Sequence, residues 1–166
     1  MEGKGNPFVL FHHHFMGRQS SAGAWINRIN TPAVNAWMGL SFELVCLLHT
    51  DQIKKKLGIQ GILTEVSSFQ CRQDPEAGIR GSQIDLVIRR ADRIIDLLEM
   101  KYTQGPYTIT KGTDEDLRRK MMDFRIATKC REATHIVMVT PFGLTRNSYA
   151  GNIQAEITAE DLFLNE

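Results

Sequence analysis

The sequence lacks the features that mark disulfide frameworks, zinc ribbons and membrane spans. Its 166 residues include only three cysteines, which are widely spaced and form no CxxC motif. This usage indicates free thiols in a reducing compartment. No apolar run approaches the roughly 20 residues that cross a bilayer, and the first six residues lack a signal peptide's apolar stretch. We therefore expect a cytoplasmic protein with no membrane partner.

Two signs of nucleotide or nucleic-acid binding are also missing. There is no GxxxxGK[ST] loop and no GxGxxG after a strand, so the usual phosphate loops are excluded. The net charge is only +1, which gives no global electrostatic case for a nucleic-acid partner. Residues 117–131 do hold six basic residues against one acid. A helix of that kind could meet phosphates, and taken alone it is equally well explained as a solvated face.

The composition that remains is that of one ordinary globular domain, with 42% hydrophobic residues. We divide the chain into a lead-in over residues 1–30 and a domain over residues 31–166. The lead-in holds three adjacent histidines, His12 to His14, among aromatic residues. Adjacent side chains cannot share one helix or strand face, so these histidines favour packing or surface positions over a metal site.

Periodicity and capping signals predict the order helix, strand, strand, strand, helix, strand. The first helix has Thr31 as N-cap and Pro32 at its first position. Thr113 is the predicted N-cap of the later long helix, which runs to about Cys130. The remaining segments are helices over 33–49 and 50–57, strands over 61–69, 83–90, 94–101 and 135–140, an edge strand over 152–158 and a short helix over 160–163. This order predicts an α/β fold with a mixed sheet flanked by helices.

The segment from Gln83 to Lys101 predicts a hairpin whose two arms are joined by a polar turn. Because side chains alternate along a strand, the first arm carries Gln83, Asp85 and Val87 on one face. One face of the second arm carries Ile95, Leu97, Glu99 and Lys101.

The length of the turn decides which residues of the two arms are opposite each other. A three-residue turn over 91–93 pairs Arg90 with Ile94 and sets Asp85 opposite Glu99, whereas a two-residue turn shifts the pairing by one. Charges on a sheet built for burial are costly unless they are paired or bind a metal. The pattern thus leaves two interpretations, an ion-pair cluster that only packs and a metal-carboxylate centre.

Asp85, followed by Glu99-Met100-Lys101 on the next strand and preceded by Glu43 on a helix, resembles the PD-(D/E)XK nuclease superfamily. That superfamily has a restriction-endonuclease-like α-β-β-β-α-β core. More narrowly, segments 37–43, 49–58, 81–86 and 99–101 look like the nuclease-like domain at the C-terminus of certain prokaryotic AAA-type ATPases, over roughly residues 8–163. Ile84 stands where the superfamily's name has proline.

The resemblance implies a Mg²⁺ site, with Mn²⁺ as an alternative ion. Its ligands would be Asp85, Glu99, the carbonyl of Met100 and, through water or a second ion, Glu43. These hard oxygen donors are the ligands that Mg²⁺ prefers.

The resemblance also implies roles for the residues around the metal. Lys101 would orient or deprotonate the attacking water or stabilise the pentavalent phosphate, and Gln83 would orient water or the lysine. Lys120 or Arg119, on the basic helix, would contact a substrate phosphate, which gives affinity without sequence specificity.

We therefore expect a metal-dependent nuclease that acts on DNA as the effector domain of an ATPase-linked system. The alternative is a catalytically silent nuclease-like module that binds protein or nucleic acid. A third hypothesis is that this chain is one domain of a longer ATPase. Restriction-like domains often pair so that two active sites meet two strands, which implies a homodimer.

Overall fold

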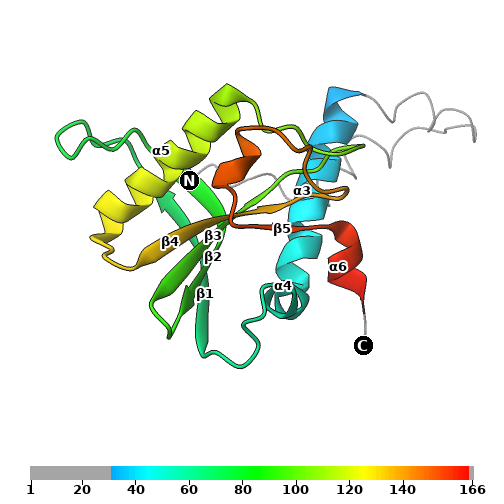
Figure 1. Cartoon of the computed structure of the whole chain (residues 1–166). Coiled ribbons are helices and arrows are strands. Elements are labelled where there is room, and N and C mark those ends of the chain that lie inside the picture. The colour runs from blue at the N-terminus through cyan, green and yellow to red at the C-terminus, as the bar shows by residue number, and fades with distance from the viewer. Residues whose placement is uncertain (1–30, 165–166) are drawn as a thin grey trace, which may run out of the picture.

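The computed structural model describes residues 31–164 of the chain (Figure 1). The predicted lead-in, with its three histidines, lies outside the described residues. The described part holds a five-stranded sheet with helices on both of its faces. Within it, no helix is long and apolar enough to cross a membrane.

The first helices follow their capping signals closely. Helix α3, Pro32–Leu48, has Thr31 as its N-cap, and the Thr31 hydroxyl accepts a hydrogen bond from the N–H of Val34 at 3.4 Å. Helix α4, Thr50–Lys56, ends just before Gly58, whose φ of +70° is the left-handed conformation that favours glycine. Both predicted helices are confirmed.

The sheet mixes antiparallel and parallel strands in the order β1-β2-β3-β4-β5. Strands β1, Thr64–Cys71, β2, Ser82–Arg90, and β3, Ile94–Met100, pair antiparallel, whereas β4, Ala133–Val139, and β5, Ala155–Ile157, continue the sheet in parallel. The long helix α5, Lys111–Thr128, connects β3 to β4. The observed order confirms the predicted α/β fold with its mixed sheet.

The hairpin of β2 and β3 has the register of a three-residue turn. Leu86 pairs with Leu98 and Arg89 with Ile95, so the same register carries Arg90 to Ile94 and Asp85 to Glu99. Arg93 in the turn adopts φ +67°, and its N–H donates to the carbonyl of Arg90 at 3.2 Å. Of the two pairings that the sequence left open, the structure has that of the three-residue turn.

A β-bulge in β2 corrects one part of the prediction. Ser67 pairs with Val87 but Phe69 pairs with Ile84, so Ser68 alone stands against Asp85 and Leu86. The extra residue breaks the two-residue alternation, and Val87 shares its apolar cluster with Ile84. The expectation that Val87 lies on the face of Gln83 and Asp85 was therefore wrong.

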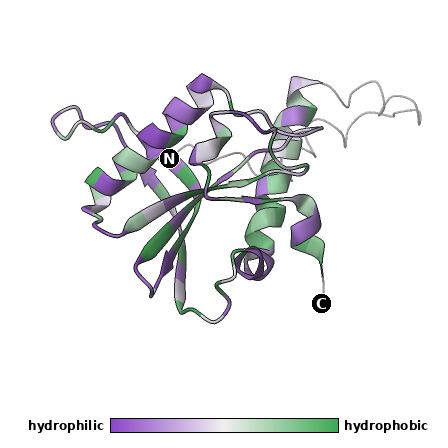
Figure 2. Ribbon diagram, in the orientation of Figure 1, coloured by the Kyte–Doolittle hydropathy of each residue, from purple (hydrophilic) through white to green (hydrophobic). Residues whose placement is uncertain are grey.

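Two layers of side chains enclose the sheet. On one face, residues such as Leu86, Leu98 and Val139 pack with Cys46 of α3, Ile53 of α4 and Leu162 of the short helix α6, Ala159–Phe163. The other face packs against α5. Figure 2 shows apolar residues along the central strands and polar ones along much of α5.

Several boundaries differ from the sequence prediction. Helix α5 begins one turn earlier than expected, because the hydroxyl of Thr110, not Thr113, caps it by accepting from the N–H of Thr113 at 3.2 Å. Strand β1 starts at Thr64 instead of residue 61, since a turn closed by the N–H of Ile62 and the carbonyl of Ile59 precedes it. The predicted last elements are present as β5 and α6, but β5 is shorter than the predicted 152–158, because a 3-10 helix over Ala150–Asn152 precedes it.

Candidate functional site

The charged group at the end of β3 centres on Glu99. This side chain is buried, with 5% of the residue exposed, and each of its carboxylate oxygens meets a lysine. Oε1 lies 2.7 Å from Nζ of Lys101, the first residue after β3, and Oε2 lies 2.7 Å from Nζ of Lys120 on α5. The predicted shared face of Glu99 and Lys101 is thus a direct ion pair, and α5 adds a second cation.

Lys101 stands where the sheet opens towards solvent. Its side chain is 44% exposed, whereas Glu99 beneath it is buried. Burial lowers the pKa of the Lys101 ammonium, but the charges of Glu99 and Asp85 outweigh it, so the pKa is raised above its ordinary value. Lys101 is therefore held as a cation between two acids.

Asp85 reaches the same end of the sheet from the bulge in β2. Its Oδ2 accepts a hydrogen bond from the backbone N–H of Met100 at 3.0 Å. The adjacent N–H of Lys101 donates to the carbonyl of Val139 at 2.9 Å, which ties this end of β3 to β4. The bulge turns the carboxylate of Asp85 towards the end of β3.

Glu43 approaches from α3. The pKa of the Cys46 thiol is raised to about 12, mainly by burial and in smaller part by the charges of Glu43 and Asp85. Both acids therefore lie near this buried residue of α3. The ring of Phe42, next to Glu43, lies 6.2 Å from that of Tyr102, centroid to centroid, so this part of α3 faces the residues after β3.

Not all of the other predicted residues lie at Glu99. Gln83 lies half-buried in β2 and pairs with Gln70. Arg119 instead binds three groups away from Glu99: it donates to the carbonyl of Gly81 at 2.9 Å, pairs with Asp123 at 3.3 Å and also pairs with Asp116. This arginine holds the start of β2 against α5, whereas Lys120 reaches the site.

The pairing of Lys120 with Glu99 was not predicted from the sequence. Within the basic run, the one available signal is spacing: Lys120 follows Leu117 by three residues, and Leu117 is buried against the sheet. A lysine at that offset lies beside the buried face of α5.

The donor types present fit a magnesium ion, but their present partners differ from those of a metal site. Asp85, Glu99 and Glu43 supply hard carboxylate oxygens. Among residues 31–164, however, no three His, Cys, Asp or Glu side chains gather as a ready metal site. Both oxygens of Glu99 are paired with lysines, so a cation bound there would take the place of at least one ammonium.

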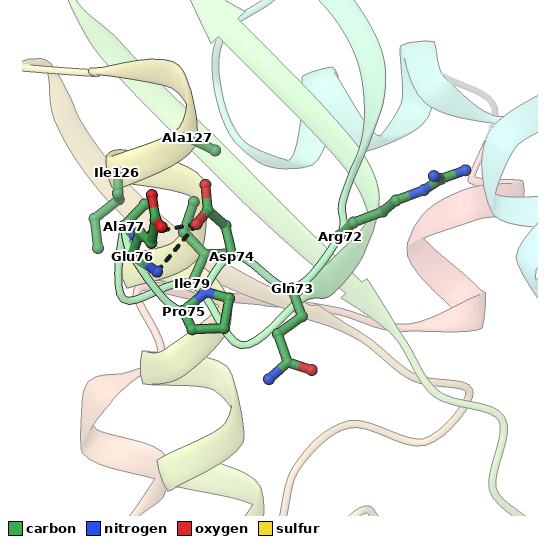
Figure 3. Close-up of a pocket in the computed structure, with 9 residues that line it drawn as sticks. All are labelled: Arg72, Gln73, Asp74, Pro75, Glu76, Ala77, Ile79, Ile126 and Ala127. Atoms are coloured by element: carbon green, nitrogen blue, oxygen red, sulfur yellow. Dashed lines mark hydrogen bonds between the residues drawn. The ribbon is translucent and has the colours of Figure 1, made fainter.

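A wide hollow among the described residues lies elsewhere. The loop of residues 72–79 and the last turns of α5 line it, as Figure 3 shows. Of its two acids, Asp74 and Glu76, the first is engaged within the loop, where Oδ1 accepts from the N–H groups of Glu76 and Ala77. Arg72 points away from the other side chains. This hollow offers no converging chemical groups.

Comparisons with known proteins add little to this geometry. No protein-family model matches the chain, and no curated protein matches it. A solved structure of a protein of unknown function, AF1548, is similar with a TM-score of 0.48 and 16% identity. The similarity covers 72% of this chain and 64% of that one, so the matched region spans less than two thirds of that protein.

Proposed function

We propose that this chain is a metal-dependent nuclease that hydrolyses phosphodiester bonds, with DNA as substrate. The observation that carries the proposal is the grouping at the end of the hairpin, where Lys101 pairs with Glu99 at 2.7 Å and Asp85 accepts a hydrogen bond from the N–H of Met100, between them in sequence, at 3.0 Å. Two acids with a lysine at this spacing are the elements that the PD-(D/E)XK resemblance requires.

Different residues would bind the metal and orient the water. Asp85, Glu99 and the Met100 carbonyl would hold Mg²⁺ or Mn²⁺, with Glu43 assisting from α3. The bound ion would lower the pKa of a water molecule and stabilise the charge that develops on the phosphate. Lys101, exposed above Glu99, would orient the attacking water or stabilise the phosphate, and Gln83 would assist that orientation.

The test is cleavage of linear and supercoiled DNA by the purified chain with Mg²⁺ or Mn²⁺. Lys101→Ala and Asp85→Ala are each expected to reduce cleavage at least about 100-fold, as loss of an acid-base or metal-binding group does. Lys111→Ala is the matched control, because Lys111 is an exposed α5 lysine that pairs only loosely with Glu115 at 3.8 Å. Circular dichroism checks that each variant folds.

The proposal fails if the wild-type chain cuts neither DNA nor RNA and calorimetry detects no metal binding. That outcome would favour the second candidate, a catalytically silent module that binds protein or nucleic acid. Glu99 supports this alternative, because both of its oxygens are already neutralised by lysines. The link to an ATPase rests on the resemblance alone, and co-purification of this chain with an ATPase subunit would test it.

A further inference from the structure

Lys120 is the α5 side chain that reaches deepest into the charged group. Its side chain is 16% exposed, against 44% for Lys101, and its Nζ lies 2.7 Å from Oε2 of Glu99. The other acid near Lys120 is Asp116, 3.9 Å away and itself paired with Arg119. Glu99 is therefore the dominant partner of Lys120.

The surroundings of this pair are apolar. Glu99 and Lys120 line a cavity of about 10 Å³ together with apolar residues of β2, β3, β4 and α5, among them Leu97 and Leu117. That volume admits about one water molecule. One water molecule stabilises the Glu99 carboxylate much less than the Lys120 ammonium does. A buried carboxylate at this position therefore needs a cation beside it.

We propose that Lys120 is a displaceable internal counter-ion, which occupies Glu99 until a divalent cation takes its place. The inference rests on the proposed nuclease function and deepens it by assigning the residue that competes with the metal. The Lys120 ammonium and a divalent cation repel each other, so only one of them can contact Oε2 of Glu99 at short range. Once released, the ammonium lies on the face of α5 that borders Lys101 and is free to bind a substrate phosphate.

The test is calorimetric titration with Mn²⁺ and Mg²⁺ in the absence of nucleic acid. Lys120→Gln removes the competing charge and is expected to bind either ion about tenfold more tightly than the wild-type chain, as loss of a partly buried competing cation implies. Lys120→Arg keeps the charge and is expected to bind as the wild type does. Lys111→Gln removes a positive charge from the exposed start of the same helix and should also leave the affinity unchanged.

Thermal unfolding gives a second readout that does not depend on cleavage. Lys120→Gln is expected to unfold at a lower temperature than the wild type without metal and to show a larger upward shift on addition of Mn²⁺. If this variant does not fold, Lys120→Met, which keeps the apolar stem, replaces it in both experiments.

The outcomes separate the inference from the proposed function. Equal metal affinity in wild type and Lys120→Gln overturns the counter-ion role but leaves the metal site in place. Weaker binding in the variant also overturns it, because Lys120 would then support the metal. No binding by either protein overturns the inference, and it overturns the proposed nuclease as well when the wild-type chain also cuts neither DNA nor RNA.

Discussion

Strand β3 carries two buried acids that differ in how their charge is compensated. Glu99, near the C-terminal end of the strand, meets two lysine ammoniums at 2.7 Å each. Asp96, three residues earlier, lies on the opposite face of the sheet. It is 2% exposed and has only Arg90 at 3.5 Å and His135 at 3.4 Å.

The compensation of Asp96 is incomplete. Its Oδ2 accepts no hydrogen bond from the described residues, and Arg90 also pairs with Asp92. Burial raises the pKa of Asp96, and the charges of Arg90 and His135 offset this only in part. Asp96 is therefore an acid that the fold tolerates, whereas Glu99 is an acid around which cations are arranged.

The contrast between Glu99 and Asp96 shows which feature marks a functional site on this sheet. Buried charge alone does not mark a site, because both acids are buried. What distinguishes Glu99 is the convergence of groups from several elements: Lys101 just after β3, Lys120 from α5 and, at the neighbouring Met100, Asp85 from β2. Asp96 is flanked only by residues of the strands next to it.

The largest effect on stability is expected for Glu99→Gln. The amide oxygen can accept from one lysine only, and its NH₂ group faces the other, so an ammonium is left without a carboxylate. Removing one member of a buried ion pair costs several kcal/mol, and the exposure of Lys101 moderates this to about 3 kcal/mol. Urea unfolding measures the loss, and a loss below that of Asp96→Asn would reverse the comparison.

Asp96→Asn is expected to change the free energy of unfolding at pH 7 by less than about 1 kcal/mol. Because the folded-state pKa of Asp96 is raised, the folded protein holds this proton more tightly than the unfolded chain does. The contribution of Asp96 to stability is thus greatest below its ordinary pKa of 3.8 and declines as the pH rises through the raised value. Relative to Asp96→Asn, the wild type should lose stability over that window.

Urea unfolding of both proteins from pH 4 to pH 7 measures this difference. A wild type that gains stability relative to Asp96→Asn as the pH rises would show that Arg90 and His135 compensate the carboxylate fully.

A stabilising effect is expected at Thr140, which follows β4. Its hydroxyl is the other buried oxygen without a hydrogen-bond partner among the described residues, and the residue is 1% exposed. Thr140→Val keeps the shape and removes this group, so the protein should become more stable by about 1 kcal/mol. Thr140→Ser is the control that keeps the hydroxyl. Destabilisation by valine but not by serine would indicate that the hydroxyl holds a buried water.

The sequence alone predicted the hairpin but left two registers open. The structure has the register of the three-residue turn over residues 91–93, with Leu86 opposite Leu98, which carries Asp85 towards Glu99. The capping pattern of Thr31 and Pro32 likewise predicted the start of α3, since local hydrogen bonds decide such ends. The prediction of Thr113 as the N-cap of α5 was wrong, because Thr110, three residues earlier, offers an equivalent hydroxyl.

Only the tertiary structure decided which distant groups meet. The bulge at Asp85 and Leu86 depends on the pairing of β2 with β1, which alternation along one strand does not encode. The packing of α5 across the sheet likewise chose Lys120 as the partner of Glu99 and directed Arg119 to Gly81 and Asp123. Local patterns therefore brought Asp85, Glu99 and Lys101 to the same end of the hairpin. Long-range packing decided which other charges lie around them.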